Sequence, residues 1–260
     1  MDAVNRTLYI PLYGKALVSR KGILLHDPKA EKIWAAEGFA LKGKSKSKWL
    51  AYYMAMRATA FDRWVAKRVE DDPHAVVLHL GCGLDNRIGR VAPEGVLWYD
   101  VDFPEVIRQR KCHYEEFDHY KMFPADVREG AWLQGISAKH AVVVMEGISM
   151  YLKPEELTGL LTSLARHFPK VSLLMDCYST LAAKMSKVKN PVNDVGVTDV
   201  YGLDDPNALT ESGLMYTGER EITPPDLIGQ LHGWEEKIFR KLYAGNMSKK
   251  LYRMYEFEKR

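Results

Sequence analysis

The chain has 260 residues, 47% of them hydrophobic and 27% charged, and its formal net charge is only +3. A chain of this length forms one large domain or one domain with an added lobe, and its nearly balanced charge argues against a nucleic-acid partner. No run approaches the roughly 18 apolar residues that a membrane-spanning helix needs, and the N-terminal residues lack the apolar core of a signal peptide. The three cysteines lie far apart and form no CxxC pair, so we expect reduced thiols and no metal site. These features predict a cytoplasmic protein without a membrane partner.

The first 72 residues have the pattern of an N-terminal helical lobe. Residues 28–37 combine helix-forming residues with a proline near the start, and residues 49–70 carry apolar side chains at helical spacing. The basic segment 43–48 (GKSKSK) could contact an anionic substrate, although a solvated loop is the simpler interpretation. We expect this lobe to cap a second unit that begins at residue 73.

The remainder of the chain, residues 73–260, alternates between strand-like and helical segments. Helical patterns cover residues 103–112 and 154–168. Strand-like, β-branched runs occupy four segments: 75–81, 96–102, 141–147 and 171–178. Runs of this type are buried on both faces of a parallel sheet, so the alternation predicts an α/β fold with a doubly wound, mostly parallel sheet.

Two later parts of the chain depart from this alternation. Residues 234–243 and 250–259 look like strands, and the intervening AGNMSKK contains a Gly-Asn pair that suits a turn. We therefore expect the sheet to end in an antiparallel hairpin. Residues 179–221 form a long polar insertion, and insertions of this length often serve as lids over binding sites.

The strongest local signal is LHLGCGLDNR, where the first predicted strand turns into a helix. Gly81 and Gly83 allow the backbone to approach a ligand closely, and the helix that follows offers free N–H groups. A tight turn without a ligand would use the same two glycines. Asn86 stands where a GxGxxG motif has its third glycine, which argues against an NAD-dependent oxidoreductase without removing that rival.

Three acidic residues stand where a nucleotide-like ligand would need them. Asp102 ends the second strand and can accept hydrogen bonds from ribose hydroxyls, although it could instead cap the following helix. Asp126, in FPADVRE, can accept a hydrogen bond from an adenine amine or cap a short helix. Glu146 ends the third strand, where such sheets bind ligands, and a buried carboxylate there needs a cationic partner such as an ammonium group.

The motifs GCGLDNR, YDVDFPEVIRQRK and MEGISMYLKPEEL together resemble the leucine carboxyl methyltransferase family, which includes bacterial O-methyltransferases of the tetracenomycin-polyketide type. The motifs that carry the resemblance span residues 10–180. It implies a class I methyltransferase fold, in which a seven-stranded Rossmann-like sheet ends in an antiparallel hairpin, and S-adenosylmethionine as the cofactor. Residue 127 is Val where Leu is more usual, and the 179–221 insertion has no match, which leaves the acceptor open.

The resemblance also implies roles for individual residues. Arg57, in YYMAMRATAFD, matches the helical arginine that binds the cofactor's carboxylate, a task suited to a bidentate guanidinium. Glu146 matches the acidic residue near the cofactor's amine. The other matched positions are Gly81 and Gly83 in the cofactor loop, Asp102 at the ribose, and Asp126 and Val127 at the adenine.

The acceptor is expected to be a carboxylate of a small molecule, a polyketide-like metabolite or a peptide C-terminus. A carboxylate is already ionised at neutral pH and needs no base, whereas a phenol would need one. No convincing base is evident, because His79 lies in the middle of a strand and is best explained as a core histidine. Tyr151 and Tyr178 are the candidates for positioning the acceptor, with Asp176 beside them, although each could be structural. Transfer to a hydroxyl group is the alternative.

Two further rival functions are less favoured. Methyltransferases that act on amino groups of nucleic acids tend to carry a (D/N)PP(Y/F) segment, and the corresponding position here contains EGISMY. A non-catalytic cofactor-binding module would keep the same cofactor residues and would differ only in its lack of turnover.

Overall fold

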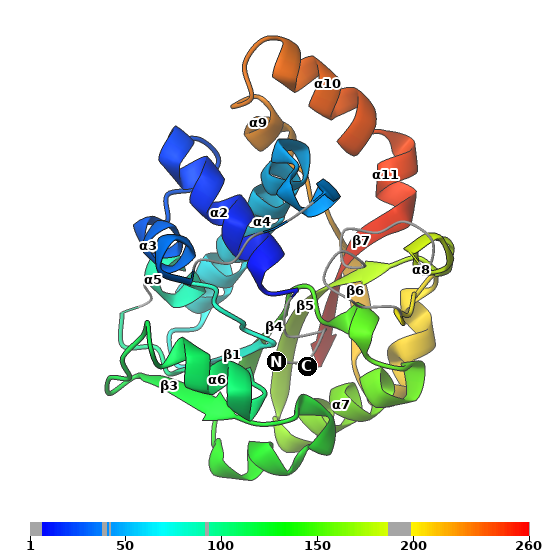
Figure 1. Ribbon diagram of the computed structural model, residues 1–260. Helices are drawn as coiled ribbons and strands as arrows, with labels where there is room; N and C mark the ends of the chain where they lie inside the picture. The colour runs from blue at the N-terminus through cyan, green and yellow to red at the C-terminus, as the bar shows by residue number, and fades with distance from the viewer. Residues whose placement is uncertain (1–6, 38–40, 42, 92–93, 187–198, 260) are drawn as a thin grey trace.

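The molecule is built around a seven-stranded sheet, and the computed structural model describes residues 7–37, 41, 43–91, 94–186 and 199–259 (Figure 1). The strand order is β3-β2-β1-β4-β5-β7-β6. The strands are β1 (Val76–Leu80), β2 (Trp98–Asp102), β3 (Tyr120–Pro124), β4 (His140–Met145), β5 (Lys170–Tyr178), β6 (Met215–Arg220) and β7 (Tyr252–Lys259). Strands β1 to β5 pair in parallel, and β7 runs antiparallel between β5 and β6. The expected sheet, parallel with an antiparallel end, is confirmed.

Helices cover both faces of this sheet. They are α2 (Tyr9–Lys21), α3 (Pro28–Glu37), α4 (Lys48–Asp71), α5 (Arg87–Val91), α6 (Pro104–Arg110), α7 (Pro154–His167), α8 (Thr180–Ser186), α9 (Pro225–Ile228), α10 (Trp234–Tyr243) and α11 (Asn246–Leu251). Short 3₁₀ turns connect them: η1 (Gly43–Lys46), η2 (Val127–Glu129), η3 (Ala131–Gly135), η4 (Ser149–Tyr151) and η6 (Pro206–Ser212). The four helical segments expected from the sequence within residues 28–168 are all present, with small differences at their ends.

Alternating side chains of the central strands divide the core into two layers. Val77 and Val142 pack with the helices that precede the sheet in the chain, whereas Val76 and Val143 pack with α7 on the opposite face. Every residue of β1 is buried. Burial on both sides explains why these strands are continuous apolar runs rather than alternating ones.

The N-terminal helices pack directly on the sheet. Helix α4 is 24 residues long and lies against α2, α5 and β4, and its Phe61 and Val65 are fully buried in the same apolar cluster as Val77 of β1. The helix ends at Asp71, and the backbone N–H of the capping residue Asp72 bonds to the carbonyl of Arg68. The boundary at residue 72 stays a prediction, and the two parts share one continuous core.

Three expectations for the edges of the sheet were wrong or incomplete. Residues 234–243 form α10 instead of a strand, and the expected turn in AGNMSKK is α11. The antiparallel partner of β7 is β6, which lies within the expected insertion, and β3 at the opposite edge was not expected. Both edge strands carry charged residues, and β6 alternates between half-buried and exposed positions, so neither has the apolar run of a central strand.

Candidate functional site

A cavity of about 640 Å³ opens at the carboxyl ends of the parallel strands. Its floor is formed by the loops that follow β1, β2, β3 and β4, and its other walls by α2, α4 and the α10–α11 region. The volume lies in the range of about 300–1,000 Å³ that small-molecule sites usually have. The position agrees with the rule that doubly wound sheets bind ligands beyond the carboxyl ends of their strands.

This cavity brings together the cofactor-site residues and the two tyrosines that the sequence singled out, but neither Asp176 nor the described residues of the basic segment 43–48 line it. Its lining includes Arg57, Gly81, Gly83, Asp102, Asp126, Val127, Glu146, Tyr151 and Tyr178. These residues come from six separate segments of the chain, so their meeting is a property of the fold. Their individual roles toward a ligand stay predictions.

The glycine loop has the backbone conformation that glycine permits. Gly81 has φ +67° and Gly83 has φ +51°. A Cβ atom on Gly81 would lie 2.0 Å from Cγ2 of Ile148, in the loop after β4. Packing between two loops therefore requires this glycine even without a ligand. The amide of Gly83 donates a hydrogen bond to Oδ2 of Asp102 at 2.8 Å, which joins the loop to the end of β2.

Of the two aspartates in β2, only Asp102 lines the cavity. Asp100 is fully buried and accepts hydrogen bonds from Arg110, Trp98 and Tyr120, so its role is structural. Asp102 accepts hydrogen bonds from the amides of Gly83 and Phe103, both at 2.8 Å. Burial nevertheless raises the pKa of Asp102 to about 6. A carboxylate with spare acceptor capacity at the cavity wall suits a ligand that donates hydroxyl hydrogen bonds.

Asp126 adopts the capping geometry that was its alternative explanation. It accepts a hydrogen bond from the amide of Arg128 at 3.0 Å and so caps η2. The guanidinium of Arg128 also binds both carboxylate oxygens, at 2.8 and 3.0 Å from Nε. Phe103 and Val127 line the cavity beside this pair. If Asp126 accepts a hydrogen bond from an adenine amine, the same carboxylate must also bind Arg128.

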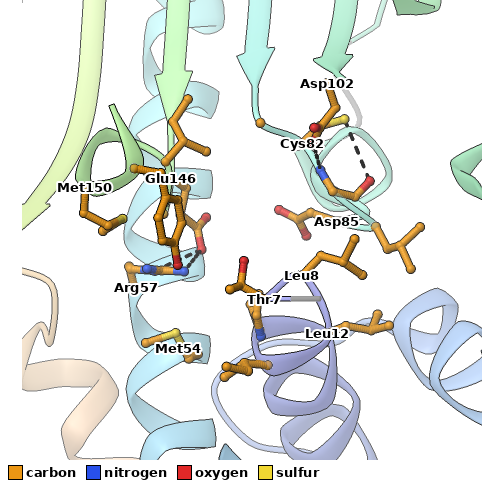
Figure 2. A pocket seen from close by; sticks show the side chains of 18 of the residues that line it. Thr7, Leu8, Leu12, Met54, Arg57, Cys82, Asp85, Asp102, Glu146 and Met150 are labelled. Atoms are coloured by element: carbon orange, nitrogen blue, oxygen red, sulfur yellow. Dashed lines mark hydrogen bonds and ion pairs between the residues drawn. The ribbon is translucent and has the colours of Figure 1, made fainter. Parts of the chain in front are cut away.

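Arg57 and Glu146 form a buried ion pair at one side of the cavity (Figure 2). Nε and Nη2 of Arg57 lie 3.1 and 3.0 Å from Oε1 of Glu146, and Arg87 binds the other carboxylate oxygen. Burial alone would raise the pKa of Glu146, but the guanidinium groups of Arg87 and Arg57 lower it to about 2. Two arginines thus neutralise Glu146, so the argument that it needs a ligand's ammonium group as its cation is not supported.

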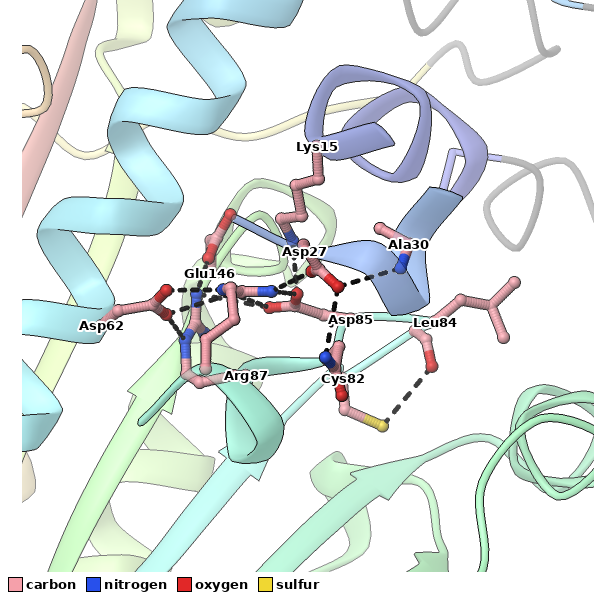
Figure 3. Close-up of polar contacts among 12 residues, drawn as sticks. Lys15, Asp27, Ala30, Asp62, Cys82, Leu84, Asp85, Arg87 and Glu146 are labelled. Atoms are coloured by element: carbon pink, nitrogen blue, oxygen red, sulfur yellow. Dashed lines mark hydrogen bonds and ion pairs between the residues drawn. The ribbon is translucent and has the colours of Figure 1, made fainter. Parts of the chain in front are cut away.

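Glu146 also belongs, through Arg87, to a larger network of charged residues that the sequence analysis did not predict (Figure 3). Lys15, in α2, is buried and lies 2.7 Å from Oδ1 of Asp85, and both residues line the cavity. Arg90 joins Asp85 to Asp62 at 2.7 and 2.6 Å. The charged run in LDNRIGR was the available signal, but no local pattern connects it to a lysine about 70 residues earlier in the chain.

Four tyrosines form a further wall of the cavity, which we call the tyrosine wall: Tyr53, Tyr151, Tyr178 and Tyr252. The ring of Tyr252 lies 5.0 Å from that of Tyr178 and 6.1 Å from that of Tyr53. Its hydroxyl donates to Asp176 at 2.6 Å and accepts from Nη1 of Arg57 at 2.5 Å. Burial raises the pKa values of Tyr53, Tyr151 and Tyr252, so these phenols keep their protons at neutral pH.

His79 also borders the cavity, but it belongs to the core as expected. Its Nδ1 lies 3.0 Å from Asp100 and its Nε2 lies 3.1 Å from Arg87. Burial lowers the pKa of His79.

Other expected or conceivable features lie outside this cavity. The described residues of the basic turn η1 do not line it. Within the described part of the chain, no cluster of His, Cys, Asp or Glu side chains could hold a metal ion, and no helix is long and apolar enough to cross a membrane.

Comparison with known proteins identifies relatives of one kind. Residues 4–165 match the family model described as leucine carboxyl methyltransferase. The tetracenomycin polyketide synthesis O-methyltransferase TcmP of Streptomyces glaucescens is 31% identical over 212 residues, which cover 80% of this chain and 78% of the relative. The S-adenosyl-L-methionine-dependent methyltransferase dpfgK of Gibberella zeae is 26% identical over 182 residues, which cover 64% of this chain and 61% of the relative.

Solved structures show the same fold at low sequence identity. The magnesium protoporphyrin IX methyltransferase ChlM of Synechocystis PCC 6803, crystallised with S-adenosylmethionine, superposes with a TM-score of 0.53 at 12% identity. The match covers 95% of this chain and 97% of that one. The same enzyme with S-adenosylhomocysteine gives a TM-score of 0.52 over 90% and 93% of the two chains, at 13% identity.

Proposed function

Since the chain belongs to the leucine carboxyl methyltransferase family and is an S-adenosylmethionine-dependent methyltransferase, we propose that it methylates a carboxylate oxygen of a small molecule or peptide. Family membership favours methyl transfer over the rival oxidoreductase. The observation that carries the choice of acceptor is the tyrosine wall, in which Tyr53, Tyr151 and Tyr252 keep their protons and the neighbouring carboxylates of Glu146 and Asp176 are already paired.

The cavity has the groups that the cofactor needs. Gly81 and Gly83 would lie against its central part, and Asp102 would accept hydrogen bonds from its ribose. Asp126 and Val127 would contact the adenine. The methionine end would lie near Arg57, Glu146, Lys15 and Asp85, which offer both charges to a group that carries an ammonium and a carboxylate. When bound, S-adenosylmethionine would supply an electrophilic methyl group on a positively charged sulfur; the acceptor oxygen would gain the methyl carbon as the carbon–sulfur bond breaks, with S-adenosylhomocysteine as the leaving group.

The guanidinium of Arg57 stays approachable because of a neighbouring glycine. Gly147 lines the cavity with φ +74°, and a Cβ atom there would lie 3.4 Å from Nη2 of Arg57. Because Gly147 has no side chain, one N–H of the Arg57 guanidinium can point into the cavity while the other N–H groups bind Glu146, Asp176 and Tyr252. This arrangement supports binding of a carboxylate group by Arg57 without disruption of the buried pairs.

The protonated phenols of the tyrosine wall are suited to an acceptor that is already ionised. Tyr53 and Tyr151 can each donate a hydrogen bond to a carboxylate, and neither can remove a proton. Two carboxylates lie behind the wall, but both oxygens of Glu146 are bound to arginines, and Asp176 is fully buried and hydrogen-bonded to Tyr252. A phenol acceptor, with a pKa near 10, would find no base here. A carboxylate needs only positioning and exclusion of water.

The test is methyl transfer from labelled S-adenosylmethionine to pairs of acceptors that differ only in a carboxylate or a phenol at the same position. We expect the carboxylates to yield methyl esters, which release methanol in mild base, and we expect a rate independent of pH between neutrality and pH 9. Binding of S-adenosylhomocysteine and of NAD should be titrated in parallel, because the cofactor assignment can hold when the acceptor assignment fails. Transfer to phenols alone, with a rate that rises toward pH 10, would contradict the carboxylate proposal.

A further inference from the structure

Helix α10 exposes a row of large apolar side chains. Trp234, Ile238 and Leu242 follow one another at intervals of four residues and are 59%, 36% and 62% exposed. Met247, in α11, continues the row and is 67% exposed. We call these four residues the apolar stripe. Figure 1 shows α10 at the margin of the molecule, away from the sheet, joined through α11 to β7.

The opposite side of α10 explains how the helix is held. Phe239 is its one fully buried residue and stacks on Tyr243 with ring centroids 5.3 Å apart. Glu235 accepts hydrogen bonds from Lys48 and Tyr52 of α4 at 2.6 and 2.8 Å. Trp234 also takes part in this anchoring, because its ring lies 5.9 Å from that of Trp49 and 4.3 Å from the Lys48 ammonium, yet more than half of its surface stays exposed. The stripe therefore leaves a large apolar area in water. An exposed apolar row of this kind usually marks an interaction surface.

The charges around the stripe indicate its partner. Lys237 and Lys241 lie one turn from stripe residues, are exposed, and form no ion pair with any described residue. Both acidic residues of α10 are neutralised within the protein, Glu235 by Lys48 and Glu236 by Arg240 at 2.7 Å. The free charge on this face is therefore positive. A helix with Trp and Leu on one face and lysines beside it has the pattern of an interfacial helix.

We propose that α10 and α11 form a docking surface for an anionic lipid bilayer, in which the apolar stripe enters the headgroup region and the lysines contact acidic lipids. A second copy of the chain is a poorer partner, because a two-fold contact through α10 would oppose Lys237 and Lys241 to their own counterparts without a free acidic residue on the helix. The net charge of +3, from which no membrane partner was expected, does not reveal this local surplus.

The docking surface adjoins the cavity. Tyr243 of α10 and Ser248 and Leu251 of α11 line the cavity, so the same two helices face the bilayer on one side and the methyltransferase site on the other. Docking would therefore bring the site to the lipid interface, where an amphipathic carboxylic acid partitions. This last consequence rests on the proposed function, whereas membrane binding itself does not.

The experiment is flotation of the full-length protein with vesicles of phosphatidylcholine alone or mixed with phosphatidylglycerol. We expect binding to the anionic vesicles only, and loss of binding at high salt. Lys237→Glu and Lys241→Glu should each lower the partition coefficient at least fivefold, as expected for about 1 kcal/mol per charge at the surface. Leu242→Ser should lower it as well, because it removes apolar area from the stripe.

Met215→Ser is the matched control, because Met215 is also 67% exposed but lies in β6, outside the stripe. It should bind like the wild type. Circular dichroism and S-adenosylhomocysteine affinity, both expected to be unchanged in all four variants, separate lost docking from lost folding or a lost cofactor site. Absence of binding to anionic vesicles would overturn the proposal. So would a dimer in sedimentation velocity that Leu242→Ser converts to a monomer, because a second copy would then cover the stripe.

Discussion

The cofactor's affinity should depend on pH through one residue, Asp102. Burial raises the pKa of Asp102 to about 6, so this carboxyl takes up a proton as the pH falls through 6. Hydrogen bonds from ribose hydroxyls are stronger to the ionised carboxylate than to the protonated carboxyl. The pKa of Glu146 is lowered to about 2, and the pKa of Asp85 is held well below its usual range by Arg90, Lys15 and Arg87. Both carboxylates therefore remain charged throughout this interval. The pKa of His79 is lowered as well.

The size of the effect follows from the titration. Because half of Asp102 is ionised at its pKa, affinity should be nearly constant above pH 7 and should fall about fivefold, or about 1 kcal/mol, between pH 6 and pH 5. Asp102→Asn removes the titration and should bind about tenfold to a hundredfold more weakly at pH 8, because hydrogen bonds to a charged acceptor contribute about 1.5–3 kcal/mol. Its affinity should then be nearly independent of pH.

Calorimetric titration with S-adenosylhomocysteine at half-unit steps from pH 5 to pH 8 measures both curves. Circular dichroism at each pH provides the control that the protein remains folded. A wild-type affinity that does not change across pH 6, or an Asp102→Asn variant with the same pH dependence as the wild type, would refute the assignment of Asp102 to the ribose.

Three other substitutions test the site. Gly81→Ala should destabilise the protein by about 2–5 kcal/mol in urea unfolding, because alanine there has a positive φ and overpacks against Ile148. Addition of Ile148→Ala should restore about 1–3 kcal/mol of this loss. No restoration would show that the contact with Ile148 is unimportant. Arg57→Met should lower the free energy of unfolding by about 3–5 kcal/mol because it leaves Asp176 without its cation and Glu146 with Arg87 alone. Addition of Glu146→Gln should cost less than the sum, and strict additivity would argue against the ion pair. Tyr178→Phe should raise the KM for the acceptor and leave S-adenosylhomocysteine affinity unchanged, whereas loss of both would indicate a structural tyrosine.

The sequence by itself determined the elements that depend on local pattern. The β-branched runs of β1, β2, β4 and β5 indicated a parallel sheet because strands buried on both faces need apolar residues at every position. The turn at Gly81 and Gly83 was evident because few other residues adopt its backbone conformation. The motifs around Asp102 and Glu146 also led to the correct family, since a carboxylate at the end of a strand has a recognisable position in the chain.

The tertiary structure decided what depends on contacts between distant residues. The segment WEEKIFRKLY has its apolar residues at 234, 238, 239, 242 and 243, which is helical and not alternating spacing, so the expected strand was a wrong assignment of the period. The tertiary structure decided how this helix is held, with Phe239 in the core and Glu235 on α4. The pairing of Glu146 with Arg57 and Arg87, rather than with a ligand, follows from the packing of α4, which carries Arg57, against β4 and against α5, which carries Arg87. Lys15 also lines the site, although the sequence around it contains no motif that would have indicated this. Burial forces such charges to find partners, and only the folded chain determines which partners are within reach.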